Sequence, residues 1–206
     1  MKKGLLFTFL FFIFSNLMAQ KISISPTGGI SKPIGTELEY WNMGFSIGAE
    51  IFVYSINKYQ LGLHISYNKW SVNDEQLLKE LFKAAEPYYS EHAGNYNVTN
   101  SSGNFTLVEI IPTIRIPLSE GKEFLLSYGG GLFILNHEAS VSGSISGSFG
   151  NFTGNFQLEK TSETRAGLQI GLIMLPSKII EINAYYNYLS NEFNYFTINL
   201  GIPFSL

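Results

Sequence analysis

The chain contains no cysteine and only one aspartate, Asp74. The lack of cysteine excludes a disulfide scaffold, a cysteine-ligated metal site and a lipid anchor on a cysteine behind a leader. A calcium loop uses several aspartates, so a single one excludes that site as well. The sequence also lacks a glycine-rich phosphate loop after a strand, a His-x-x-x-His pair and a nucleophile elbow. These absences leave no standard catalytic motif.

Charged residues make up only 14% of the chain, against about 25% in typical soluble domains. There are 13 basic and 16 acidic side chains, and without a basic surplus we expect no nucleic-acid partner. After residue 20 no apolar run approaches the ~20 residues that a spanning helix needs. Phenylalanine, tyrosine and glycine are plentiful, as in a membrane barrel with aromatic girdles and small inward-facing residues.

Residues 1–20 have the pattern of a secretory signal peptide. Lys2 and Lys3 form a positive start, residues 5–14 are apolar apart from Thr8, and a cleavage region follows at 15–19. The apolar run is too short for a membrane anchor and ends in polar residues. We expect cleavage between Ala19 and Gln20, which leaves a single barrel domain over residues 21–206.

The C-terminal stretch 194–206 alternates with a period of two from Phe196 onwards. Its apolar positions are Phe196, Ile198, Leu200, Ile202, Phe204 and Leu206, and small or polar residues lie between them. This pattern predicts a β-strand with one apolar and one polar face. The strand has about the 9–11 residues that cross a bilayer when tilted.

Seven earlier segments repeat this alternation, which predicts an all-β fold: an eight-stranded, antiparallel, up-and-down transmembrane β-barrel. The predicted strands are residues 22–30, 43–54, 59–70, 105–116, 124–135, 165–174, 180–188 and 194–206. Tight turns (55–58, 119–122, 176–177) and long links (71–104, 136–163) indicate short periplasmic turns and long extracellular loops. Three consecutive glycines, 129–131, predict a bend or bulge in the fifth strand.

Aromatic residues on the apolar face fall at both ends of the predicted strands. Those at the turn end are Tyr59, Phe124 and Phe204, and those toward the loop end are Phe45, Tyr67, Tyr186, Tyr188 and Phe196. Two such girdles are expected at the two membrane interfaces. A soluble barrel would reverse the faces, with apolar residues inside.

The final strand, Tyr-Phe-Thr-Ile-Asn-Leu-Gly-Ile-Pro-Phe-Ser-Leu, and the fourth, Val-Glu-Ile-Ile-Pro-Thr-Ile-Arg-Ile, carry a resemblance to a known family. With them the mature chain resembles the outer-membrane β-barrel family of Gram-negative bacteria, in its eight-stranded OmpA/OmpX-like and PorT-like group. The resemblance implies an architecture and a location, and it implies no activity. The chain ends in Leu206, where many relatives have an aromatic residue.

The inward faces of the predicted strands carry charged residues of both signs. They are Glu50, His64, Glu109, Arg115, Arg165 and Glu181. An eight-stranded barrel is just wide enough to be filled by side chains, so these charges should pair in a polar network inside the lumen. The competing interpretation is a gated ion path or a proton-sensitive element centred on His64.

A second alternative is enzymatic. The segment His64-Ile65-Ser66 loosely resembles the His-x-Ser element of lipid A deacylases, which are also eight-stranded barrels. A Ser–His pair backed by a carboxylate would be an activated nucleophile. The alternation, however, directs His64 and Ser66 into the lumen, whereas that family acts on lipid at the outer surface.

Two long loops carry further patterns. Asn73 can cap a helix over residues 74–86, with Leu77, Leu78, Leu81, Phe82 and Ala85 on its apolar face. We expect a lid on the barrel rim, or alternatively a helix that binds a partner or the membrane surface. In the other loop, alternating serines and a turn at Gly150-Asn151 predict a hairpin above the membrane, whose edges a partner strand can join.

Together these patterns predict a monomeric, non-enzymatic barrel without cofactor or metal. Its expected location is the outer membrane of a Gram-negative bacterium, with both mature termini periplasmic. The expected role is that of a surface or envelope protein that contacts outer-membrane lipid and, through its extracellular loops, a protein partner. The alternative is a small pore or a barrel associated with transport or secretion, in the manner of the PorT-like group.

Overall fold

The computed structural model describes residues 22–35, 38–56, 59–83, 95–121, 123–147, 150–189 and 193–205. The predicted signal peptide therefore lies outside the described residues. The elements are β1 (Ser23–Ile34), β2 (Gly44–Ile56), β3 (Tyr59–Ser71), α2 (Asp74–Lys83), β4 (Asn95–Pro117), β5 (Phe124–Gly147), β6 (Gly150–Ser177), β7 (Ile180–Leu189), β8 (Phe193–Gly201) and β9 (Phe204–Ser205). Within the described part of the chain, no helix has the length and apolar composition needed to span a bilayer.

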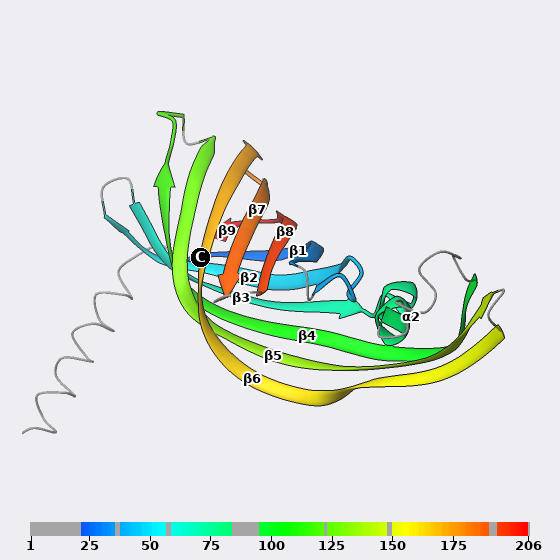
Figure 1. Cartoon of the computed structure of the whole chain (residues 1–206). Helices are drawn as coiled ribbons and strands as arrows, with labels where there is room; N and C mark the ends of the chain where they lie inside the picture. The colour runs from blue at the N-terminus through cyan, green and yellow to red at the C-terminus, as the bar shows by residue number, and fades with distance from the viewer. Residues whose placement is uncertain are drawn as a thin grey trace, which may run out of the picture.

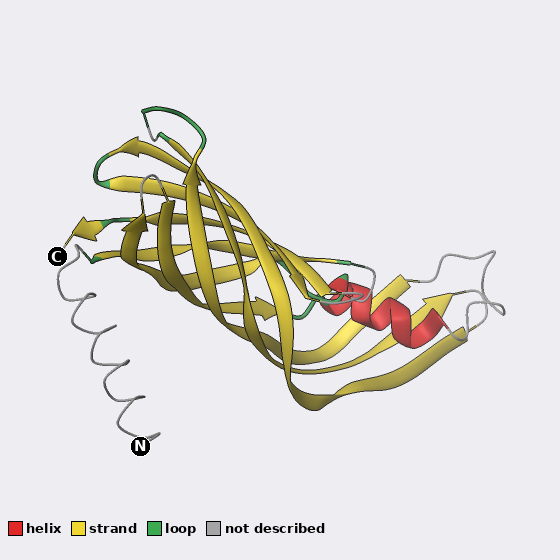
Figure 2. Cartoon of the chain, turned by 90° about the vertical axis from the view of Figure 1, so that its left-hand side faces the viewer, coloured by secondary structure: helices red, strands yellow, loops and turns green. Residues whose placement is uncertain are grey.

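The strands form one closed antiparallel barrel, as Figures 1 and 2 show. Each strand from β1 to β8 pairs with the next, and β1 also pairs with β8, which closes the sheet. The short β9 follows β8 and pairs with the start of β1, so it continues the same wall after Ile202 and Pro203. The predicted eight-stranded barrel is thus confirmed, including the seam at which its first strand, β1, pairs with its last long strand, β8.

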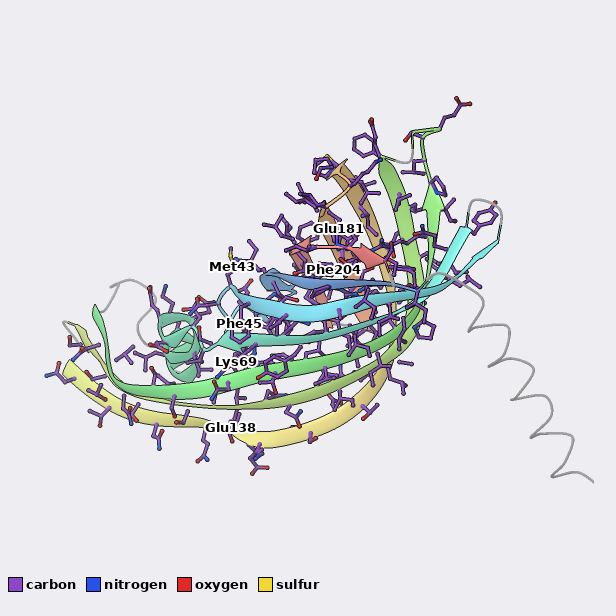
Figure 3. All side chains as sticks on the ribbon, turned by 180° about the vertical axis from the view of Figure 1, so that it is seen from behind. Met43, Phe45, Lys69, Glu138, Glu181 and Phe204 are labelled. Carbon is purple, nitrogen blue, oxygen red and sulfur yellow. The ribbon has the colours of Figure 1, made fainter. Side chains whose placement is uncertain are left out.

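The two faces of the wall are those of a membrane barrel. Large apolar side chains such as Ile47, Leu132 and Leu200 are exposed on the outside, whereas Glu50, His64 and Asn183 are buried inside. Figure 3 shows the outward side chains, with Phe45 and Phe204 labelled toward opposite ends of the barrel. Soluble barrels have the reverse arrangement, because their apolar residues fill the interior. The predicted inside-out polarity is confirmed.

Three strands are much longer than a membrane crossing requires. β4, β5 and β6 contain 23, 24 and 28 residues, against the ~9–11 of a transmembrane strand. Their surplus forms a three-stranded sheet that rises past the loop end of the barrel, which we call the extension (Figure 1). Residues 95–104, read from the sequence as an exposed loop, are in fact strand paired with β5.

The predicted hairpin of the extension is present, but its turn is displaced. Gly147 pairs with Gly150, so Gly150 and Asn151 belong to β6 instead of forming the turn. No register shift marks the bend or bulge predicted at 129–131, and the shift in β5–β6 pairing lies elsewhere, between His137 and Ala139. The β4–β5 pairing is interrupted there, between Ile110–Leu132 and Thr113–Gly129. A side chain at Gly131 would lie 2.8 Å from the Cα atom of Ile111. This glycine therefore permits the close approach of β4 and β5.

Candidate functional site: a filled lumen beneath a three-stranded extension

The centre of the lumen network is Arg115, which enters from β4 and is 5% exposed. Its Nη1 atom lies 3.2 Å from Glu181 Oε2, and its Nη2 atom donates to Glu50. The guanidinium also lies 3.9 Å from the ring centroid of Phe52, a cation–π distance. One planar cation thus joins carboxylates from β2 and β7 across the barrel, where a charge without a partner would be strongly unfavourable.

His64 links the ion pairs of Arg115 to a third carboxylate, Glu109. Its Nδ1 atom is 3.6 Å from Glu50 and its Nε2 atom 3.5 Å from Glu109, and all three side chains are buried. The imidazole ring also packs edge-on against Tyr185, at 5.2 Å between centroids. The charged side chains therefore form one continuous row from Glu181 to Glu109.

Neutral side chains complete the hydrogen bonding of the carboxylates near Arg115. Ser25 donates to Glu181 at 2.6 Å, and Tyr185 donates to Glu50. Asn183 donates to both carboxylates, at 3.2 Å to Glu50 and 3.1 Å to Glu181. Buried carboxylates with several donors remain favourable as anions, so these contacts stabilise the charged row.

The far end of the row is held in the same way. Ser66 donates to Glu109 at 2.7 Å, Asn68 donates to the same oxygen, and Gln169 lies 3.4 Å from the other oxygen. Gln169 also donates to Asn187 at 3.0 Å. Strands β3, β4, β6 and β7 are thereby cross-linked through the middle of the lumen.

Above this polar layer, the loop end of the lumen is filled by a cluster of aromatic and aliphatic side chains, here called the aromatic plug. Trp70 is fully buried at its centre, with ring centroids 5.1 Å from Phe105 and 5.6 Å from Tyr195. Phe193 packs 5.0 Å from Phe105. A smaller apolar group of Leu125, Ile173 and Leu175 lies with Tyr185 below the row. The lumen is thus filled with side chains in successive layers.

Residues 38–43, between β1 and β2, lie across the top of the aromatic plug. Trp41 is 5% exposed and packs 5.2 Å from Phe105. It forms an isolated bridge with Val72, and the Asn42 backbone N–H donates to the Ser71 carbonyl at 2.9 Å. This loop therefore covers the barrel mouth and is fixed to the end of β3.

Helix α2 begins where the sequence predicts. The Gln76 backbone N–H lies 3.3 Å from Asn73 Oδ1, which is the expected N-cap contact. On the solvent side Lys79 pairs with Glu75 at 2.6 Å, and its hydrogen bond lowers the pKa of that carboxyl. Leu77 and Leu78 are fully buried. The helix lies against the concave face of the extension and contacts β4, β5 and β6 (Figures 1 and 2).

The seat of α2 on the extension depends on Gly143. A Cβ atom at this position would lie 2.7 Å from one Leu78 methyl carbon and 2.6 Å from the Asn97 carbonyl oxygen. We therefore expect Gly143→Ala to displace the helix, since overpacking typically costs about 1–3 kcal/mol. Amide hydrogen exchange over residues 74–80 should become on the order of tenfold faster.

Gly28→Ala provides the matched control, because a side chain there would meet nothing within 4 Å. It should leave exchange in the helix at the wild-type rate. Unchanged exchange in the Gly143 variant would mean that the contact with Leu78 does not hold the helix in place.

The edges of the extension are open. Pairing between β6 and β7 begins at Leu168, so within the described ranges residues 150–167 of β6 pair only with β5. On the other side, pairing between β3 and β4 ends at Asn104. Unpaired backbone N–H and C=O groups along such edges are available to an added strand.

The structure brings five of the six predicted lumen residues together: Glu50, His64, Glu109, Arg115 and Glu181. Arg165 lies apart. Its side chain is 35% exposed and pairs with Glu163 at 2.6 Å, because its position on β6 is at the level of the mouth. On α2, Leu77 and Leu78 are fully buried. The side chains of Leu81 and Phe82 are not among those described, and Ala85 lies outside the described residues.

Sequence reasoning missed the aromatic plug and the neutral members of the network. Tyr185, Asn183 and Asn68 share the inward face of their strands with charged residues that were identified, so alternation alone would have found them. The signal for the plug is similar: Phe105 and Leu107 have the same parity as Glu109.

The arrangement of His64 and Ser66 does not form a nucleophile pair. Both side chains are buried in the lumen, and the Ser66 hydroxyl donates to Glu109. His64 meets carboxylates on both of its ring nitrogens. Across the described residues, no group of three or more histidine, aspartate or glutamate side chains is arranged to hold a metal ion.

Comparison with solved structures finds other barrels. The attachment invasion locus protein Ail of Yersinia pestis matches with a TM-score of 0.46 and 15% identity, over 90% of this chain and 99% of that one. A major outer membrane protein of Thermus thermophilus matches with a TM-score of 0.46 and 8% identity, over 89% and 99%. Neisserial surface protein A matches with a TM-score of 0.42 and 13% identity, over 88% of this chain and 95% of that one. These three structures are outer-membrane barrels.

No protein-family model matches the chain, and no curated protein matches it. The strand pairing within this chain itself shows the closed barrel.

Proposed function

We propose that this protein is a non-enzymatic surface protein of the outer membrane of a Gram-negative bacterium, in which a closed barrel anchors an extracellular binding extension. Residues 1–20 direct export and are removed, and both mature termini lie in the periplasm. The observation that carries the proposal is the continuation of β4, β5 and β6 past the barrel mouth, with α2 packed on them.

The construction of the extension supports a binding role. A link that only joined two membrane strands would need a few residues, whereas this one is a sheet that buries side chains together with α2, including Val141 of β5 and Leu78 of α2. The open β6 edge at 150–167 offers backbone groups to an extended peptide. A protein that adds a strand at this edge is the partner that we infer.

The filled lumen argues against the alternative role as a pore. Conduction needs a continuous water path, yet the aromatic plug and the charged row occupy the lumen in succession. Trp70, Phe133 and Tyr195 are each at most 1% exposed. A narrow eight-stranded barrel filled in this way serves as an anchor.

A cysteine-labelling experiment tests the location and orientation. Because the chain has no cysteine, a single introduced thiol is the only target. We expect Glu159→Cys, on an exposed part of the extension, to react with a membrane-impermeant maleimide on intact cells. Lys178→Cys, in the exposed turn between β6 and β7, should react only after permeabilisation.

The two variants control for each other, since both positions are exposed and both should react in permeabilised cells. If only Lys178→Cys were labelled on intact cells, the barrel would have the orientation opposite to the one proposed. A protein that fractionates away from the outer membrane, with neither variant labelled on intact cells, would contradict the proposed location.

A further inference from the structure

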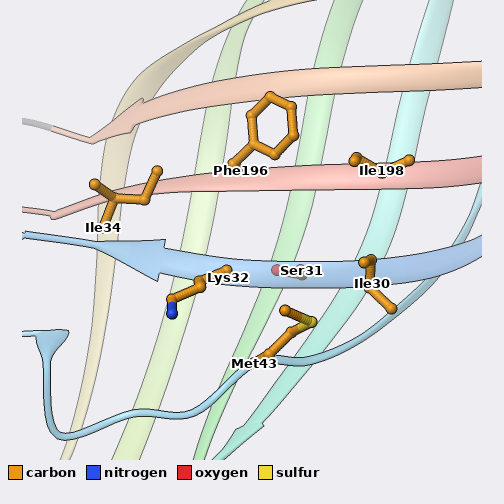
Figure 4. Close-up of a pocket in the computed structure, with 7 residues that line it drawn as sticks. All are labelled: Ile30, Ser31, Lys32, Ile34, Met43, Phe196 and Ile198. Atoms are coloured by element: carbon orange, nitrogen blue, oxygen red, sulfur yellow. The ribbon is translucent and has the colours of Figure 1, made fainter.

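A groove lies on the outer wall of the barrel, directly over the seam between β1 and β8. It has a volume of about 290 Å³ and is lined by Ile30, Ser31, Lys32, Ile34, Met43, Phe196 and Ile198. The Ser31 side chain is buried on the lumen side, so the groove floor is formed by apolar side chains. Figure 4 shows Phe196 and Ile198 on β8, Met43 before β2, and Lys32 on β1 between Ile30 and Ile34.

Lys32 breaks an otherwise apolar row. The outward positions beside it, Ile30 and Ile34, are 49% and 46% exposed to the surroundings of the barrel. Lys32 is exposed as well, and within the described part of the chain it has no ion-pair partner. It lies two residues before the loop end of β1, where a lysine can extend its ammonium from the apolar band to the headgroup layer.

The groove and the lysine together match an amphiphile. A volume of about 290 Å³ is at the lower limit of ordinary ligand sites, roughly 300–1,000 Å³, and suits one acyl chain better than a whole ligand. On a lipid-facing wall the occupant of an apolar groove is a hydrocarbon chain, and an unpaired ammonium at its headgroup end selects an anion.

We propose that this groove binds phosphorylated lipid A of the outer leaflet, with one acyl chain along Phe196 and Ile198 and a phosphate on Lys32. The site spans the hydrogen-bonded seam that closes the barrel, where Lys32 pairs with Phe196. A lipid seated there contacts both closing strands at once. The choice of lipid rests on the proposed outer-membrane location, but its binding is measured on purified protein.

Native mass spectrometry of the detergent-purified barrel tests the site with two probes: bisphosphorylated lipid A and the same lipid without phosphates. The wild type should bind the phosphorylated form about fivefold more tightly, as expected for one lysine at a membrane surface. Lys32→Gln should lose this preference by weakening only the phosphorylated form, and Lys32→Arg should retain it. Met43→Trp, which narrows the groove, should weaken both probes.

Lys69→Gln is the matched control, because Lys69 lies near the loop end of β3, which β2 separates from β1 and the seam. It should leave both affinities at the wild-type level. The proposal is overturned if Lys32→Gln keeps the phosphate preference, if Lys69→Gln loses as much, or if the wild type does not distinguish the two probes. Should Met43→Trp not fold, the lysine variants decide alone. Surface labelling of Glu159→Cys tests the location separately.

Discussion

Replacement of Arg115 by methionine is expected to lower the free energy of unfolding of the barrel by about 3–5 kcal/mol. The change removes the cation that contacts Glu50 and Glu181, both at most 1% exposed. Glu181 would then be left with neutral donors, and Glu50 with neutral donors and His64 at 3.6 Å. Denaturant titration of the barrel in lipid vesicles, followed by the mobility of unheated protein in gels, measures the loss.

Arg165→Met is the matched control. This arginine also forms an ion pair, at 2.6 Å to Glu163, but its side chain is 35% exposed. Exposed pairs contribute about 0–1 kcal/mol, so the variant should unfold close to the wild type. Adding Glu50→Gln and Glu181→Gln to Arg115→Met should restore part of the stability, because the uncompensated charges are gone. Equal stability of the two arginine variants would contradict a stabilising role for the row.

Trp70→Ala is expected to destabilise the protein by about 3–5 kcal/mol through the cavity that it leaves in the aromatic plug. Trp70 is fully buried, packs against Phe105 and Tyr195, and donates from its indole to the Ser31 carbonyl at 3.1 Å. The same titration measures the effect. Gel mobility is the better readout here, because the substitution removes one of only two tryptophans.

Trp70→Phe separates packing from the hydrogen bond. It retains an aromatic ring in the aromatic plug and loses the indole N–H, so it should cost about 1–3 kcal/mol. We therefore expect the stability order wild type, Trp70→Phe, Trp70→Ala. An alanine variant as stable as the wild type would mean that the plug collapses around the space or does not contribute to stability.

The sequence predicts the barrel wall well because the membrane imposes one rule on it. Every outward position within the bilayer must be apolar, so the alternation in β3 and β8 reveals both the strand and its inner face. The rule ends where the strands leave the lipid. Residues 99–104 of β4 carry no apolar side chain on either face, and they form a strand because they pair with β5 in the extension that α2 packs on.

The alternation along a strand predicts whether a side chain points into the lumen, but it does not predict the level of that side chain along the barrel axis. Arg165 pairs with Phe133 and shares its inward parity, so the sequence places it with Arg115. The sequence does not reveal that Phe133 lies in the aromatic plug, near the loop end of the lumen. At that level Arg165 contacts Glu163 and solvent, and it does not reach the charged row. Depth depends on strand tilt and on register with neighbours, which are properties of the assembled sheet.

The continuity of β4, β5 and β6 has a mechanical consequence. A ligand that pulls on the tip of the extension loads the long ladders between these strands along their length, so many hydrogen bonds resist in parallel. If the binding site were on an irregular loop, the pulling force would first extend the backbone of that loop. The extension should therefore transmit a pulling force directly to the membrane-embedded barrel, because β4, β5 and β6 run through both parts without a break.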